Sequence, residues 1–154
     1  MKVKTSVLTL ALCFAASAVC FASDTQMGTW KLNESKSKVA AGMPKNNTIV
    51  FEAAGDSVKV TIDGTTADGK PMHSEWTGKL DGKDYPVTGD PSSDMRSYKQ
   101  IDDHTLVVNI KNGGKVTITG RVVVSADGKT RTVTTSGTDP QGKKVKGSTV
   151  YDKQ

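Results

Sequence analysis

Apolar and polar residues alternate along most of the chain from residue 28 onwards, in short runs separated by turns. A repeat of two residues is typical of a β-strand that packs one face on a core and exposes the other to water. We count nine or ten such runs. The apolar positions of the clearest runs are Ile49 and Phe51; Val58, Val60 and Ile62; Leu106, Val108 and Ile110; Val116, Ile118, Val122 and Val124; and Val145, Thr149 and Tyr151.

Turns that contain glycine separate these runs, most clearly in the Asp-Gly-Lys triplets that begin at Asp68, Asp81 and Asp127. Glycine and its small polar neighbours tolerate the positive φ that tight hairpins need. Consecutive hairpins form an antiparallel meander, and a long meander avoids exposed edges best by closing into a barrel. The pattern therefore predicts an all-β fold, an antiparallel up-and-down β-barrel of eight to ten strands.

Two segments depart from the alternation. Residues 33–40 can form one or two helical turns, capped by Asn33 or Ser35 and stopped by Pro44. Residues 79–93 form the longest irregular segment, and Pro86 and Pro91 restrict its backbone. We expect this second segment to be a loop at the rim of the barrel.

The first 22 residues have the pattern of a secretory signal peptide. Lys2 and Lys4 precede an apolar run that is shorter than a membrane span, and small residues follow at Ala18 and Ala22. We expect residues 1–22 to be removed, leaving one exported domain of residues 23–154, periplasmic or secreted and without a transmembrane anchor. A lipoprotein signal is the disfavoured alternative, because Leu12 and Val19 stand before the two cysteines where a small residue is needed.

Composition excludes several classes of function. Both cysteines lie in residues 1–22, so the exported domain has no disulfide and no thiol nucleophile. Removal of Lys2 and Lys4 lowers the formal net charge from +5 to +3, and the remaining basic residues are scattered through turns. A solvated surface is favoured over a nucleic-acid site.

The two ends of the exported domain resemble a known family. Gly28-Thr29-Trp30 resembles the opening strand of lipocalins and fatty-acid-binding proteins, and Val150-Tyr151-Asp152-Lys153-Gln154 is similar to the closing strand of the latter. These proteins form the calycin superfamily. The resemblance implies a lipocalin-like barrel of eight to ten strands in which Trp30 plugs the closed end, with an internal cavity for a small apolar ligand. Because a buried indole N–H needs an acceptor, we expect that of Trp30 to find a carbonyl.

The chain departs from the fatty-acid-binding proteins in two ways that affect the expected ligand site. Fatty-acid-binding proteins hold a carboxylate with Arg-x-Tyr in the last strand, whereas this chain has Thr149-Val150-Tyr151, so Tyr151 is retained without the cation. Arg121 or Arg131 could supply the cation from a neighbouring strand. Arg121 alternates with the polar residues of its run, which favours the outer face, whereas the alternation around Arg131 does not indicate a face. The connection before the second strand is also too short for a pair of covering helices.

Inward parity, size and the resemblance select nine candidate ligand-binding residues. They are Phe51, Val60, Met72, Trp76, Tyr98, Val108, Ile118, Arg131 and Tyr151. The apolar and aromatic members can equally be core residues, since an interior face serves both purposes. The domain has few aromatic residues and its aliphatic residues are mostly valines. This composition favours a small or partly hydrated cavity over a long apolar one.

We therefore expect an exported, monomeric barrel that binds a small hydrophobic or amphipathic molecule, with no catalysis, cofactor or metal. The alternative is a scaffold that meets a protein or envelope partner through its outer surface or residues 79–93. A hydrolase that uses His73 and Glu75, which share a strand face, is a minor third alternative, because no third ligand lies at a useful spacing and His104 follows a predicted turn at residues 102–103.

Overall fold

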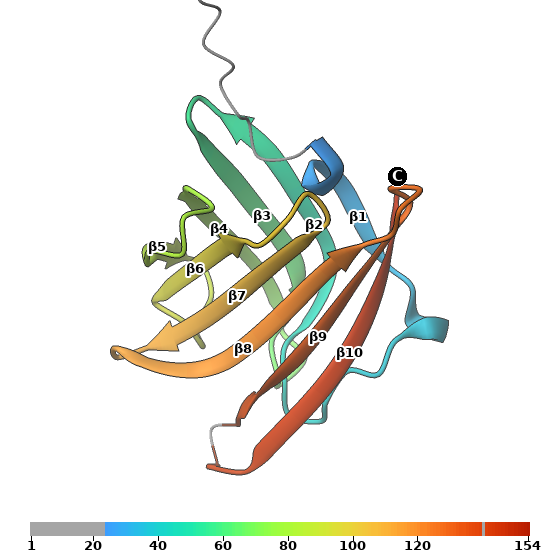
Figure 1. Cartoon of the computed structure of the whole chain (residues 1–154). Coiled ribbons are helices and arrows are strands. Elements are labelled where there is room, and N and C mark those ends of the chain that lie inside the picture. The colour runs from blue at the N-terminus through green and yellow to red at the C-terminus, as the bar shows by residue number, and fades with distance from the viewer. Residues whose placement is uncertain (1–23, 140) are drawn as a thin grey trace, which may run out of the picture.

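The alternating runs form β-strands in the computed structural model, which describes residues 24–139 and 141–154 (Figure 1). The strands are β1 (Gly28–Leu32), β2 (Lys45–Ala54), β3 (Ser57–Thr65), β4 (Pro71–Gly78), β5 (Tyr85–Thr88), β6 (Met95–Gln100), β7 (Thr105–Asn112), β8 (Lys115–Val124), β9 (Thr130–Thr138) and β10 (Lys144–Lys153). Two short 3-10 helices, η1 (Asp24–Gln26) and η2 (Glu34–Lys36), flank β1. The predicted signal peptide, residues 1–22, lies outside the described residues.

The strands close into a barrel in which each strand pairs antiparallel with the next along the chain. β1 completes the ring, because Trp30 lies opposite Ile49 of β2 on one side and opposite Lys153 of β10 on the other. The prediction of an all-β, antiparallel up-and-down barrel is confirmed, and the described residues form ten strands.

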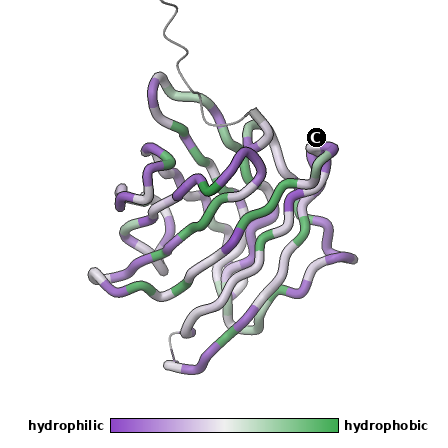
Figure 2. The backbone as a smooth tube through the Cα atoms, viewed as in Figure 1, coloured by the Kyte–Doolittle hydropathy of each residue, from purple (hydrophilic) through white to green (hydrophobic). Residues whose placement is uncertain are grey.

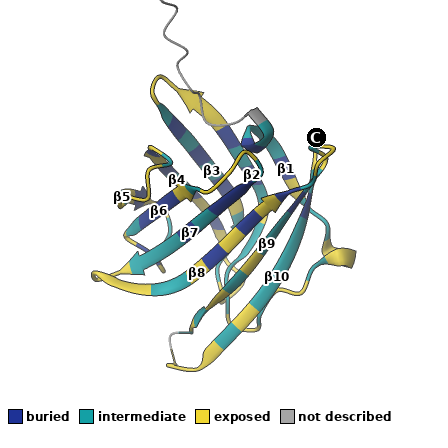
Figure 3. Ribbon diagram, viewed as in Figure 1, coloured by how far each residue is buried: buried dark blue, intermediate teal, exposed yellow. Residues whose placement is uncertain are grey.

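Burial alternates along the strands as the sequence pattern predicts (Figure 3). In β3, Val58, Val60 and Ile62 are buried and Asp63 is exposed. Hydrophobic and hydrophilic residues follow one another along the same strands (Figure 2). The apolar side chains are thus turned to the barrel axis, where they form one continuous core.

Val116 is an exception to the predicted alternation, since it is 53% exposed. Ile110 pairs with Ile118, but the next residue, Lys111, pairs with Val116, so Thr117 is an extra residue in β8. Such a β-bulge changes the side to which the residues beyond it point. The prediction that Val116 faces inward is wrong for this reason.

Residues 79–93 are not a loop throughout, as predicted, because Tyr85–Thr88 within them forms β5. This strand pairs at two positions with β4, through Thr88 and Val87, and at two with β6, through Tyr85 and Pro86. β5 thereby fills the gap between β4 and β6 and completes the wall.

The predicted helical turn near residues 33–40 is confirmed only at η2. The side chain of Asn33 caps it, accepting a hydrogen bond of 3.2 Å from the backbone N–H of Lys36. None of the helices in the described part of the chain has the length and apolarity needed to span a bilayer.

Candidate functional site

One end of the barrel is closed by the N-terminal turn. η1 lies beside the β6–β7 loop (Figure 1), and Gln26 donates a hydrogen bond of 3.1 Å from Nε2 to the carbonyl of His104. Trp30 is fully buried, and its Nε1 donates to the carbonyl of Gln26 at 3.0 Å. The burial of Trp30 and a carbonyl partner for its indole N–H were both expected, and both are confirmed.

The barrel interior holds a cavity of about 130 Å³. Six of the nine predicted residues line it: Met72, Tyr98, Val108, Ile118, Arg131 and Tyr151. Phe51, Val60 and Trp76 are also buried, at most 1% exposed, but they belong to the core and not to the cavity lining. Residues 39, 40, 43 and 44 of the β1–β2 connection line the cavity too, and within that connection only η2 is helical.

Arg131 points into the barrel and is 2% exposed, which settles its ambiguous parity; Arg121 is exposed. The guanidinium carbon lies 4.2 Å from the ring centroid of Phe51 and 5.8 Å from that of Trp30. Among the described residues Arg131 takes part in no ion pair, and its Nε and Nη1 have no hydrogen-bond partner. A buried cation therefore stands in the cavity wall without a counter-ion.

Burial lowers the pKa of Arg131 to about 10, an effect opposed by electrostatic interaction with Tyr98 and Tyr151. A guanidinium with that pKa remains charged at neutral pH. Burial also raises the pKa of the Tyr151 hydroxyl, although a hydrogen bond with Thr149 works in the other direction. Tyr151 is thus a neutral phenol that can donate a hydrogen bond.

Aromatic rings pack around Phe51, against which the guanidinium of Arg131 lies. Tyr98 packs edge-on against Phe51, with ring centroids 5.7 Å apart, and against Trp76, with centroids 4.8 Å apart. Tyr151 lies directly opposite Arg131 in the pairing of β9 with β10, so the two side chains leave the sheet on the same face. The register therefore places Tyr151 beside Arg131 on the inner face of the sheet.

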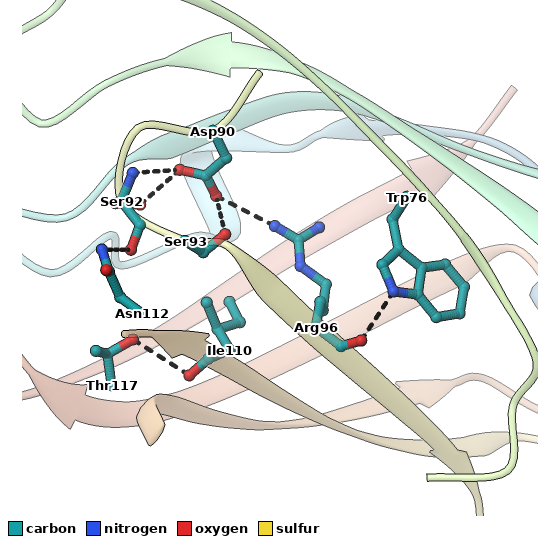
Figure 4. A network of polar contacts seen from close by, with 8 residues as sticks. All are labelled: Trp76, Asp90, Ser92, Ser93, Arg96, Ile110, Asn112 and Thr117. Atoms are coloured by element: carbon teal, nitrogen blue, oxygen red, sulfur yellow. Dashed lines mark hydrogen bonds and ion pairs between the residues drawn. The ribbon is translucent and has the colours of Figure 1, made fainter. Parts of the chain in front are cut away.

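A second arginine in the cavity wall, Arg96, is neutralised. Its Nη2 lies 3.2 Å from Oδ2 of Asp90, and the two side chains are 5% and 7% exposed (Figure 4). Ser93 Oγ donates to the same carboxylate oxygen at 2.8 Å. The backbone N–H and Oγ of Ser92 donate to the other oxygen at 2.9 and 2.6 Å. Asp90 therefore has partners on both oxygens, as a buried carboxylate requires.

The same network connects the β5–β6 loop to three strands. Asn112 of β7 donates to the carbonyl of Ser92 at 3.0 Å, and Trp76 of β4 donates to the carbonyl of Arg96 at 2.8 Å (Figure 4). Sequence reasoning missed Asp90 and Arg96. Asp90-Pro91 has the composition of a turn, and one arginine in a strand most often faces water, so neither residue carried a signal.

The cavity lining contains three formally charged side chains: Asp90, Arg96 and Arg131. The first two compensate each other, which leaves one positive charge. Most of the remaining wall is apolar, with inward residues such as Ile49, Ile62, Val122 and Val133. Ile49, Ile62 and Val122 have the parity of the predicted lining residues in their own runs, so the alternation could have identified these three as well.

The proposed acid–base pair of the hydrolase alternative lies on the outer wall. His73 is 60% exposed and its Nδ1 lies 2.6 Å from Asp63, while Glu75 is held at 2.6 Å by Lys59. The Nε2 of His73 is 3.9 Å from Glu75. In the described part of the chain, no group of three or more Cys, His, Asp or Glu residues is placed to hold a metal ion.

Comparison with known proteins found no match among family models and none among curated proteins. Similar solved structures were found, and two of them are the following. The redesigned β-barrel mFAP1, bound to DFHBI, is 15% identical, with a TM-score of 0.47 over 86% of this chain and 98% of that chain. EF1p2_mFAP2b, also bound to DFHBI, is 12% identical, with a TM-score of 0.50 over 86% of this chain and 97% of that chain. The likeness to EF1p2_mFAP2b is one of fold.

Proposed function

We propose that this protein is an exported, lipocalin-like barrel that binds a small apolar or amphipathic molecule in its interior and performs no chemistry on it. The observation that carries the proposal is the cavity of about 130 Å³, which combines an apolar wall with a few buried polar groups. That combination is typical of small-molecule sites, in which apolar surface provides affinity and polar groups fix orientation.

The size of the cavity limits the ligand. A dry cavity of about 150 Å³ in another protein accepts benzene. A space of about 130 Å³ therefore suits one aromatic ring or a short branched chain. A long acyl chain would not fit within this space.

Export is part of the proposal and rests on the amino-terminal sequence pattern, Lys2 and Lys4 followed by an apolar run and small residues. The compartment is the periplasm or the extracellular medium, and the barrel acts as a monomer.

The test is a titration of the protein with three one-ring probes, toluene, benzyl alcohol and benzoate, followed by calorimetry. Native mass spectrometry of the protein from its own host would identify a co-purifying molecule. At least one probe should bind saturably.

A matched pair of variants on β8 tests whether the cavity is the site. Ile118 lines the cavity, while Thr119 is exposed on the outer face. Ile118→Phe should fill the cavity and abolish probe binding, whereas Thr119→Phe should leave it intact. If no probe binds and no molecule co-purifies, the cavity function fails and the scaffold alternative, acting through the outer surface or residues 79–93, gains support.

A further inference from the structure

A notch opens in the barrel wall where β8 and β9 part. The two strands pair at seven positions, the last of which joins Ile118 to Gly137. Beyond that position, within the described part of the chain, residues 115–116 of β8 pair only with β7, and Thr138 of β9 pairs only with β10. β8 and β9 diverge towards the end of the barrel opposite η1 (Figure 1). The sheet is thus split over its last few residues.

Two local features shape the split. Thr117 is the extra residue of the β8 bulge, so the start of β8 follows β7 and not β9. Gly137 stands at the last paired position, where an added Cβ would lie 2.3 Å from the carbonyl oxygen of Thr117. The absent side chain allows the two backbones to approach closely at this point, and it leaves the floor of the notch open.

The notch is a hollow of about 360 Å³. On the β8 side it is lined by Val116, a large aliphatic side chain that is nevertheless 53% exposed. On the β10 side it is lined by Lys144 and Lys146, which are exposed, and by Val145 between them, which also lines the interior cavity. Apolar surface and amino groups therefore meet in one place.

The positive charge of the notch is not compensated. Among the described residues neither Lys144 nor Lys146 takes part in an ion pair, and no Asp or Glu lines the hollow. Lys143 extends the run to three lysines within four residues. Asp139, in the β9–β10 turn, accepts hydrogen bonds from the backbone N–H groups of Gln141 and Lys143. An anionic partner is thus complementary to this surface.

The strand edges decide which kind of anion fits. A strand that pairs on one side only leaves backbone N–H and C=O groups free on its other side. Residues 115–116 and Thr138 present such edges to the notch. An extended peptide can pair with these edges by β-strand addition. A nucleic acid, an anionic polysaccharide or a lipid head group has no matching backbone.

We propose that the notch between β8 and β9 binds an extended segment of a partner protein in which acidic and apolar residues alternate. Successive side chains of a strand point to opposite faces, so the acidic ones lie on the outer face against Lys144 and Lys146, and the apolar ones point inwards to Val145. The notch shares Ser136, Gly137 and Val145 with the cavity lining, but this inference requires no molecule in the cavity.

The first experiment follows the backbone amide signals of the isotope-labelled protein, expressed from the full chain, by NMR. The probe is the blocked peptide acetyl-Glu-Val-Glu-Val-Glu-amide, and the signals of Val116, Thr117, Gly137 and Thr138 should shift saturably. A peptide with lysine in place of each glutamate should not bind. A peptide with methyl groups on both valine nitrogens should bind about tenfold more weakly or worse, because it cannot donate those hydrogen bonds.

A matched set of lysine variants tests the charge. Lys144→Gln combined with Lys146→Gln should weaken binding of the acidic peptide about three- to thirtyfold, the effect of two exposed ion pairs. Lys129→Gln is the control. Lys129 is exposed and in no ion pair among the described residues, and it lies in the turn at the other end of the same two strands, so its substitution should leave the affinity unchanged.

Each part of the inference can be overturned separately. Equal affinity for the acidic and the basic peptide would remove the role of charge, and equal affinity for the N-methylated peptide would remove the pairing with the strand edges. Shifts confined to residues outside the notch, or no saturable shift, would overturn the whole inference. None of these results bears on the one-ring probes of the cavity, so the proposed function is judged independently.

Two further measurements test other occupants of the notch. Sedimentation velocity would reveal a dimer that the double lysine variant dissociates, and vesicles of phosphatidylglycerol would reveal a membrane surface. A dimer of that kind, or binding to the vesicles without binding to the acidic peptide, would assign the notch to a second copy of this chain or to a lipid surface and overturn the proposed partner.

Discussion

Trp30 interacts with three different elements of the barrel. Its indole is fully buried and donates a hydrogen bond to the carbonyl of Gln26. Lys153 Nζ lies 5.2 Å and the Arg131 guanidinium 5.8 Å from the ring centroid. These residues belong to η1, β9 and β10. One side chain thus joins the closed end of the barrel to its last two strands.

Trp30→Ala should therefore lower the free energy of unfolding by about 3–5 kcal/mol, because it removes a large buried ring and leaves a cavity. Trp30→Phe is the informative companion, since it keeps an apolar ring but loses the N–H bond to Gln26, and it should cost less. Urea denaturation followed by circular dichroism measures both. A loss under about 1 kcal/mol for the alanine variant would show that the ring is dispensable.

At the scale of single residues, the sequence predicted where some side chains point but not others. Trp30 could be predicted, because a glycine two residues before it and its place at the start of the domain carry a pattern. The direction of Arg131 could not, since threonines occupy both faces of the run around it and Val133 is its single aliphatic residue, so no apolar alternation is visible. Its partners, Phe51 and Trp30, come from distant strands that only the closed barrel brings together.

Among the elements, β5 depends on a close approach of backbones. Gly89, directly after β5, has φ of +76°, and a Cβ built on it would lie 2.0 Å from the carbonyl oxygen of His73 in β4. Only glycine permits both the backbone conformation and the contact. The pairing of Thr88 with Glu75 next to it requires the two strands to meet at this distance.

Gly89→Ala should be much more destabilising than Gly69→Ala. Gly69 has a similar φ of +81°, but an added methyl group there would lie in open space. The positive φ costs each variant about 1–2 kcal/mol, and the clash should add about 1–3 kcal/mol in Gly89→Ala alone. Thermal and urea unfolding of the two variants gives the difference. Equal losses would mean that β4 and the β5–β6 loop can separate at no cost.

The elements themselves were predictable where alternation was long and unpredictable where local chemistry interrupted it. β3 and β7 have clear periods, so their existence and inward faces were correct. β5 was missed because Tyr85-Pro86-Val87-Thr88 is short and lies between Asp-Gly and Asp-Pro, which are turn signals. Val116 was misplaced because a single bulged residue, Thr117, leaves no mark in the composition.

At the scale of the whole molecule, hydrogen bonds and ion pairs at the surface lower the pKa of several carboxyl groups. Hydrogen bonding and charge from Lys45 lower the pKa of Glu34, and a hydrogen bond from Ser125 is the main cause that lowers the pKa of Asp127. Hydrogen bonds from Lys70 and Thr66 lower the pKa of Asp68 to about 2. Residues 23–154 contain no cysteine, so these contacts act together with burial and without disulfides.

The barrel should lose stability in acid. A carboxylate whose pKa is lower in the folded than in the unfolded protein stabilises the fold above the unfolded pKa, near 4, and ceases to do so as the pH falls through the folded value. For these groups the loss runs from about pH 4.5 down to about pH 2. Urea midpoints measured at pH 7, 4 and 2.5 should decrease in that order.

High salt provides the control for this prediction. Screening weakens exposed ion pairs, so 0.5 M sodium chloride should reduce the difference between pH 7 and pH 2.5. A midpoint that does not change between these pH values would show that the surface carboxylates contribute equally little in both protonation states.

The narrow pairing of β5 has a kinetic consequence for the barrel wall. β9 pairs with β10 at nine positions, whereas β5 pairs with each neighbour at two. Few backbone hydrogen bonds must break for β5 to separate, so its amide protons should exchange with deuterium sooner than those of β9, without unfolding of the rest. A molecule could then enter or leave the interior sideways, through the wall, at a rate set by this one strand.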